Sequence, residues 1–161
     1  MPIRNRFAEL QDEITAWRHD FHENPELMFD VERTAGIVAE KLKAFGCDQV
    51  VTGIGKTGVV GVIRGKTDGS GRTVGLRADM DALPIEEATG VAYASKVPGK
   101  MHACGHDGHT AMLLGAAGSL AETRTFDGSV AVIFQPAEVG GGGGGEMVND
   151  GMVVEFGIEG V

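Results

Sequence analysis

The densest group of potential metal ligands lies in residues 101–109, which hold three of the five histidines and one of the two cysteines. Thiolate and imidazole ligands at this density suit a divalent transition metal better than calcium or magnesium. A cysteine packed as a small apolar side chain, beside histidines that crowd a helix start, would give the same pattern. We favour the metal site, because carboxylates elsewhere in the chain support it.

Two of these carboxylates, Asp79 and Asp81, follow a predicted strand at residues 74–78. The period of two along a strand places both side chains on one face. Asp79 could instead pair with Arg77 or cap a helix. The sequence favours neither this structural role nor a role in the site. For Asp81 we favour a functional role.

A third carboxylate, Glu138, closes a continuous apolar strand at residues 129–134. Open α/β sheets bind ligands beyond the carboxyl ends of their strands. We therefore expect Glu138 to border the same crevice as Asp81, close to Cys104 and His106.

Apolar periodicity predicts the elements that position these residues. Spacings of three and four indicate amphipathic helices, whereas continuous apolar runs indicate buried strands or helices. The alternation of helices and buried strands predicts an α/β layered domain with a mixed sheet. We expect helices at 7–21, 35–45, 111–117 and 146–156, an antiparallel hairpin of strands at 59–63 and 74–78, a loop at 82–100, and a central strand at 129–134.

Composition limits the classes of partner. The chain has 161 residues and a net charge of −9, which argues for one domain and against nucleic acid or an anionic membrane surface. No apolar run is long enough to span a bilayer, and the start does not resemble an apolar signal core. Two cysteines are too few for a disulfide framework, so we expect a cytoplasmic protein.

Six consecutive glycines at residues 140–145 follow Glu138. Such a run could be a flexible connector, but its position after a strand-end carboxylate favours close approach of backbone to a ligand. No Gly-Lys-Ser/Thr follows the run, which excludes a P-loop, and the chain has no Gly-x-Ser-x-Gly element of a serine hydrolase.

Four segments carry a resemblance to a known family: residues 18–27, 76–84, 102–109 and 134–138. In order along the chain, they resemble the M20 metallopeptidase family, in particular its branch of hippurate hydrolases, N-acyl-amino-acid deacylases and auxin-conjugate hydrolases. The resemblance implies a three-layer α/β/α zinc-peptidase-like catalytic domain that binds two zinc or manganese ions and hydrolyses N-acyl amino acids to a carboxylate and an amino acid. Residues 1–161 would form the N-terminal portion of that domain, without the lid and dimerisation domain.

The resemblance also implies roles for individual residues. Cys104 and His106 match two family metal ligands, Glu138 matches the general base, and Asp81 matches the aspartate that orients a ligand. A metal ion that activates water beside a carboxylate fits the reaction chemically. The remaining histidines suit supporting or structural roles; these are His19, His22, His102 and His109.

One departure from the family pattern leaves a second interpretation open. The family has a metal-ligating glutamate after Glu138, whereas this chain has Val139, and residues 1–161 end before the next ligand histidine. The chain could therefore be a catalytically silent metal-binding or interaction module derived from such an enzyme. We also expect self-association through strand edges that the absent part of the domain would cover.

Overall fold

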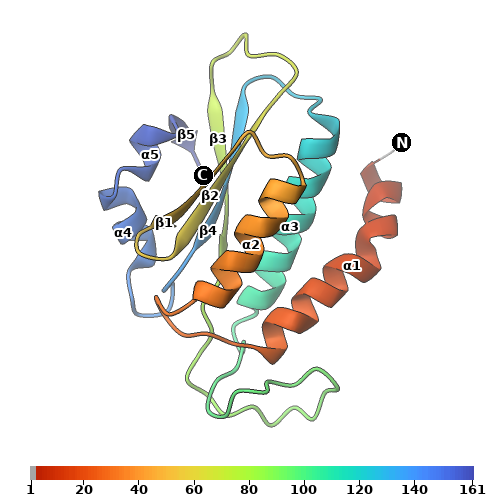
Figure 1. The fold of residues 1–161 in the computed structure, drawn as a ribbon, viewed down its shortest axis with the longest axis vertical. Coiled ribbons are helices and arrows are strands. Elements are labelled where there is room, and N and C mark those ends of the chain that lie inside the picture. Colours follow the sequence, from red (N-terminus) through yellow and green to blue (C-terminus); the bar gives the residue numbers. More distant parts are fainter. Residues whose placement is uncertain (1–2) are drawn as a thin grey trace.

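The computed structural model describes residues 3–161 and shows a mixed five-stranded sheet with helices on both faces (Figure 1). Helices α1, α2 and α3 cover one face, while the short helices α4 and α5 cover the other. This arrangement confirms the predicted α/β class and mixed sheet. The strands are β1 (Gln49–Ile54), β2 (Gly58–Arg64), β3 (Thr73–Asp79), β4 (Ser129–Gln135) and β5 (Ile158–Gly160); the helices are α1 (Ile3–Glu23), α2 (Glu32–Ala44), α3 (His106–Thr123), α4 (Gly143–Asn149) and α5 (Met152–Glu155).

Strand β4 occupies the centre of the sheet, whose order is β1-β2-β4-β3-β5. It pairs antiparallel with β2 and parallel with β3. Val132 and Phe134 are fully buried on one face and Ala131 on the other, which confirms that the apolar run is a sheet interior.

The predicted hairpin between β2 and β3 is wrong, because β4 lies between these two strands. The hairpin partner of β2 is β1, which the sequence analysis missed, across the turn at residues 55–57. Physically, the continuously apolar β4 gains most from the central position, where both of its faces are covered. Strand β1 lies at the edge and is only partly buried, so its apolar signal is weak.

The helices predicted at 7–21 and 111–117 lie within α1 and α3, and the helix predicted at 35–45 matches α2 except for Phe45, which is its C-cap residue. A further correction concerns the end of the chain. The expected helix at 146–156 is two short helices, α4 and α5, separated by Gly151, whose φ of +88° ends the first. Gly46, with φ of +79°, follows α2 as its C-cap pattern predicted. Helix α3 begins at His106, so His106 and His109 lie in its first turn, whereas His102 precedes the helix.

Two apolar clusters hold the layers together. The larger one joins α1, α2 and α3 to the sheet, with Phe21, Leu42 and Leu114 among its buried members. The smaller one joins α4 and α5 to the other face, with Met147 and Phe156 packed on the strands. Within the described residues, no helix is long and apolar enough to cross a membrane.

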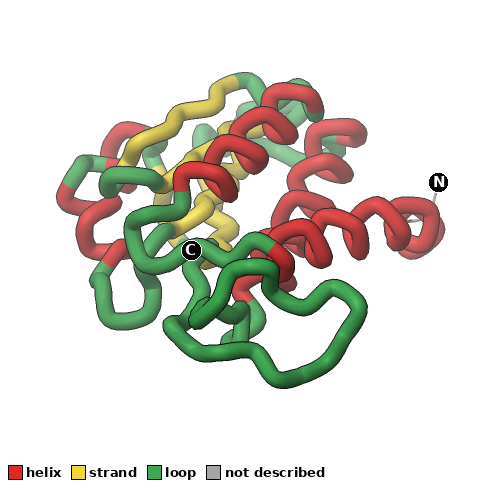
Figure 2. Tube along the Cα trace, turned by 60° about the horizontal axis from the view of Figure 1, so that its bottom comes forward, coloured by secondary structure: helices red, strands yellow, loops and turns green. Residues whose placement is uncertain are grey.

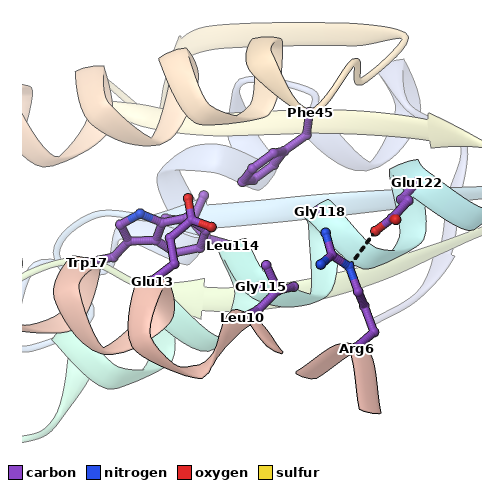
Figure 3. A pocket seen from close by; sticks show the side chains of 9 residues that line it. All are labelled: Arg6, Leu10, Glu13, Trp17, Phe45, Leu114, Gly115, Gly118 and Glu122. Carbon is purple, nitrogen blue, oxygen red and sulfur yellow. Dashed lines mark hydrogen bonds and ion pairs between the residues drawn. The ribbon is translucent and has the colours of Figure 1, made fainter. Parts of the chain in front are cut away.

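A cavity of about 350 Å³ lies between α1 and α3, where Trp17, Leu114 and Phe45 surround it (Figure 3). An ion pair of 2.8 Å between Arg6 Nε and Glu122 Oε2 joins the two helices beside it. The cavity is remote from the histidine cluster, because its mid-helix floor lies roughly 13 Å along α3 from the helix start. It has no part in the site described below.

Candidate functional site

The candidate site lies where β3 and β4 end side by side. These strands are parallel and in register up to the pair Asp79 and Gln135, so the segments that follow both strands emerge at one edge. Helix α3 begins at the same edge, after a long loop that reaches from β3 (Figure 2). The fold thus brings Asp79, Asp81 and Glu138 to the start of α3.

His106 lies among these three carboxylates. Its Nε2 is 3.6 Å from Asp79 Oδ1 and 3.8 Å from Glu138 Oε2, while its Nδ1 is 3.4 Å from Asp81 Oδ1. The imidazole is buried, with 2% of its surface exposed. The structure therefore places the expected acids and His106 in one group.

The hydrogen bond at His106 Nδ1 determines what the other ring nitrogen can do. Nδ1 lies 2.8 Å from the backbone oxygen of Asp81, and a carbonyl oxygen only accepts, so Nδ1 donates. Nε2 of the neutral ring then keeps its lone pair. That lone pair faces the side of the site that holds Asp79 and Glu138.

His109 joins the group one turn further along α3. One potential ligand atom from each of Asp79, His106 and His109 lies within 4.8 Å of the other two. His109 Nδ1 donates to Asp79 Oδ1 at 2.7 Å, and Arg77 Nη1 lies 3.2 Å from the other oxygen, so the pairing with Arg77 also forms. Burial alone would raise the pKa of Asp79, but the His109 hydrogen bond and the charge of Arg77 hold it below its ordinary value.

Asp81 fixes the segment that carries Glu138. The backbone N–H groups of Glu138 and Val139 donate to the two carboxylate oxygens of Asp81, each at 3.0 Å. The Asp81 side chain is fully buried, whereas 42% of the Glu138 side chain is exposed. One aspartate thus holds His106 through its backbone oxygen and Glu138 through its carboxylate.

The glycine run packs against the end of β4. A Cβ at Gly143 would clash with the backbone oxygen of Pro136, and one at Gly144 would lie 2.9 Å from Gln135 Oε1. Ala137, just before Glu138, has a φ of +49°, and its oxygen accepts from the Gly143 N–H. The close backbone approach expected from this run is therefore made to the strand end itself, where it shapes the turn that presents Glu138.

Cys104 lies outside the group of Asp79, His106 and His109. It is exposed in the loop just before α3 and borders a neighbouring cavity together with His22 and His102. Gly105, with φ of +88°, separates Cys104 from His106 and turns the chain into the helix. Val139 contributes its backbone N–H to Asp81 and has no side-chain donor for a metal.

Behind this edge, two side chains of α1 contact Asp107 in the first turn of α3. His22 Nδ1 donates to Asp107 Oδ2 at 2.8 Å, and Arg18 Nε lies 3.2 Å from the same oxygen. His102 is also buried there, and burial lowers its pKa from 6.5 to about 4. Sequence reasoning missed the His22–Asp107 pair, because no local signal connects residues that are 85 positions apart.

Comparisons with known proteins identify the family of the chain. Residues 75–161, more than half of the chain, match the Peptidase family M20/M25/M40. The chain belongs to this family. It is 53% identical to a hippurate hydrolase of Campylobacter jejuni over 156 residues, covering 97% of this chain and 40% of that protein. It is 44% identical to an N-acyl-L-amino acid amidohydrolase of Geobacillus stearothermophilus, covering 94% of this chain and 40% of that protein.

A solved structure shows the same fold. The YXEP protein of Bacillus subtilis, described as a dinuclear metal binding peptidase of the M20 family, superposes with a TM-score of 0.85 at 38% identity. The match covers 91% of this chain and 41% of that one. The chain therefore spans about two fifths of the length of the curated and solved relatives it matches.

Proposed function

We propose that residues 1–161 form the N-terminal portion of the catalytic domain of a metal-dependent amidohydrolase. Its substrates are N-acyl amino acids of the hippurate class, which it hydrolyses to a carboxylate and an amino acid. The observation that carries the proposal is the His106 Nε2 lone pair, which lies within 4 Å of carboxylate oxygens of Asp79 and Glu138 at the strand ends. The names of the hippurate hydrolase and N-acyl-L-amino acid amidohydrolase relatives support the substrate class.

The donor set fits a divalent transition metal such as zinc or manganese. We assign Cys104 and His106 as protein ligands, and the closeness of Asp79 and His109 to His106 makes both further candidates. Thiolate, imidazole and carboxylate are the ligands that zinc takes in proteins. When bound, such an ion would supply Lewis-acid activation of water and of the amide carbonyl.

Glu138 is the proposed general base. Its carboxylate is half-exposed at the site, so it can reach a water molecule beside the substrate. The carboxylate would take the proton of the attacking water and later deliver it to the nitrogen of the departing amino acid. Asp81 acts as a positioning residue, because its backbone oxygen orients His106 and its carboxylate fixes the backbone of Glu138.

Val139 supports a second candidate function. In this role the chain binds metal or a partner without catalysis, because valine occupies the place of a family metal ligand and has no lone pair to donate. We also propose a reducing compartment such as the cytoplasm, which fits the free thiols of Cys47 and Cys104.

Hydrolysis of N-benzoylglycine by the purified chain, loaded with zinc or manganese, tests the proposal. Any turnover above a metal-only control should be almost entirely lost in Glu138→Gln, which keeps the size of the side chain but removes the base. Glu146→Gln, an exposed change on α4, is the matched control and should keep full turnover. Metal binding without any turnover would support the silent module instead.

A further inference from the structure

A short segment between α1 and α2, residues 26–30, contacts the ends of both strands that carry the site. The Glu26 backbone oxygen accepts the N–H of Ala82 at 2.7 Å, and the Met28 backbone oxygen accepts the N–H of Ala137 at 3.0 Å. Both donors belong to buried residues, so water cannot take the place of either oxygen. Loss of either bond would leave a buried N–H without an acceptor.

The two N–H groups lie next to functional residues in the chain. Ala82 directly follows Asp81, and Ala137 directly precedes Glu138. The Asp81 carboxylate in turn accepts the backbone N–H of Glu138 at 3.0 Å. Segment 26–30 therefore fixes the two partners of that contact relative to each other from a third place in the chain.

Met28 and Ala137 share an uncommon backbone conformation. Met28 has a φ of +51° and Ala137 a φ of +49°, and only two other non-glycine residues in the described part of the chain have a positive φ. A side chain in this left-handed region costs free energy, and such residues persist where their surroundings hold them, often at functional sites. Here the two strained residues are hydrogen-bonded to each other beside the proposed base Glu138.

Contacts on either side keep the segment in this conformation. The Glu26 carboxylate accepts the backbone N–H groups of Arg33 at 3.1 Å and Thr34 at 2.8 Å, in the first turn of α2, whose N-cap residue makes no side-chain cap hydrogen bond. A carboxylate at a helix N-terminus is also stabilised by the helix dipole. The Thr57 hydroxyl donates to the Phe29 backbone oxygen at 2.8 Å, which joins the segment to the turn between β1 and β2.

We propose that Met28 is a positioning residue for Glu138. Its left-handed turn holds Ala137 in place and thereby directs the Glu138 carboxylate toward His106. Glu26 anchors this turn, because it joins the segment both to α2 and to the end of β3. The inference rests on the proposed function only for the role of Glu138 as the base, since the positioning itself requires neither metal nor turnover.

Solution NMR of the metal-free chain, in chelator-containing buffer, tests this positioning. In the wild type we expect NOE contacts between the Glu138 side chain and the His106 ring, whose Nε2 lies 3.8 Å from Glu138 Oε2. Met28→Pro removes the left-handed conformation, since proline fixes φ at about −65°, and should abolish these contacts while those between α1 and α3 remain. Met28→Gly keeps the backbone oxygen and adopts the conformation without strain, so it should keep the contacts.

Glu26→Gln supplies a second test that does not depend on proline. Glutamine leaves one acceptor oxygen for the two N–H groups of α2, so hydrogen exchange of the Ala82 and Ala137 amides should become at least about tenfold faster. Glu32→Gln, the same change at an exposed position in the same helix turn, is the matched control and should change these rates less than about twofold. A loss of global stability alone would accelerate exchange throughout the sheet, whereas positioning predicts the largest change at these two amides.

Several results would overturn the proposal. One is NOE contacts between Glu138 and His106 that survive in a folded Met28→Pro variant. Another is their absence from the wild type or from Met28→Gly. Equal exchange of the two amides in Glu26→Gln and Glu32→Gln would overturn it as well, and this comparison decides the matter if Met28→Pro does not fold.

Zinc uptake and turnover, measured separately, distinguish this proposal from the proposed function. A chain whose Glu138 contacts depend on Met28, but which takes up no zinc, upholds the positioning and contradicts the metal-dependent amidohydrolase. A chain that hydrolyses N-benzoylglycine, while its Met28→Pro variant keeps the contacts, overturns the positioning and leaves the amidohydrolase standing.

Discussion

Replacing Asp81 with asparagine tests the residue that contacts both His106 and the backbone of Glu138. The two carboxylate oxygens accept one backbone N–H each, from Glu138 and Val139, at 3.0 Å. Asparagine has the same shape but only one acceptor oxygen, and its NH₂ group faces the other backbone N–H. Because the side chain is fully buried, water cannot replace the lost acceptor.

The expected cost follows from this loss. A hydrogen bond to a charged group is worth about 1.5–3 kcal/mol, so Asp81→Asn should lower the free energy of unfolding by roughly 2–3 kcal/mol. With a urea m-value of about 2 kcal/mol/M, the unfolding midpoint should fall by roughly 1 M. Asp81→Ala removes both acceptors and should cost more than Asp81→Asn.

Asp127 supplies a matched control for this measurement. Its two oxygens also accept from two consecutive backbone N–H groups, those of Gly69 and Ser70 at 2.9 Å, but the side chain is exposed. Water can satisfy the freed N–H in Asp127→Asn, so its midpoint should move much less. The reasoning fails if Asp81→Asn unfolds within about 0.2 M of the wild type, or if the two variants lose equal stability.

Three further predictions concern stability and assembly. Burial lowers the pKa of His102 to about 4, so the folded chain binds fewer protons than the unfolded chain between about pH 6.5 and 4. As the pH falls through this window, the free energy of unfolding should therefore decrease by about 3 kcal/mol more in the wild type than in His102→Gln. An equal pH dependence of the two free energies, measured by urea unfolding, would contradict this. Gly145→Ala, with open space and an ordinary φ inside α4, should raise the stability by about 0.5–1 kcal/mol, whereas Gly143→Ala should lower it through a backbone clash, both measured by thermal unfolding. Met112 and Val161, which are 61% and 75% exposed, border a hollow of about 480 Å³ beside the edge strand β5. Sedimentation at micromolar concentration should therefore show self-association that Met112→Lys reduces. A monomeric wild type would rule this association out.

The elements that carry strong local patterns could be predicted from the sequence. The spacing of apolar residues located α1 and α2, and the continuous apolar run located β4 in the sheet interior. The neighbours of β2 could not be predicted in the same way. Pairing depends on which strand gains most from burial on both faces, and β4 follows β2 only after a long stretch of chain.

The residues of the candidate site also differ in whether a local sequence pattern reveals them. Asp81, Cys104, His106 and Glu138 belong to compact motifs at strand ends or a helix start, so the sequence singled them out. The contact between Asp79 and His109 was missed, although the spacing of His106 and His109 along a helix is a local signal that could have suggested it. Contacts between distant segments, such as those of His22 and Arg18 on α1 with Asp107, become visible only in the folded chain.

Zinc binding by the purified chain and its His106→Asn variant tests the central claim most directly, measured by equilibrium dialysis with elemental analysis. His19→Asn, which alters a histidine stacked on Tyr93, is the control. The account predicts that the wild type and His19→Asn bind zinc alike, that His106→Asn binds at least about tenfold more weakly, and that Cys104→Ser also loses affinity. Zinc binding by a folded His106→Asn variant with wild-type affinity would contradict the account.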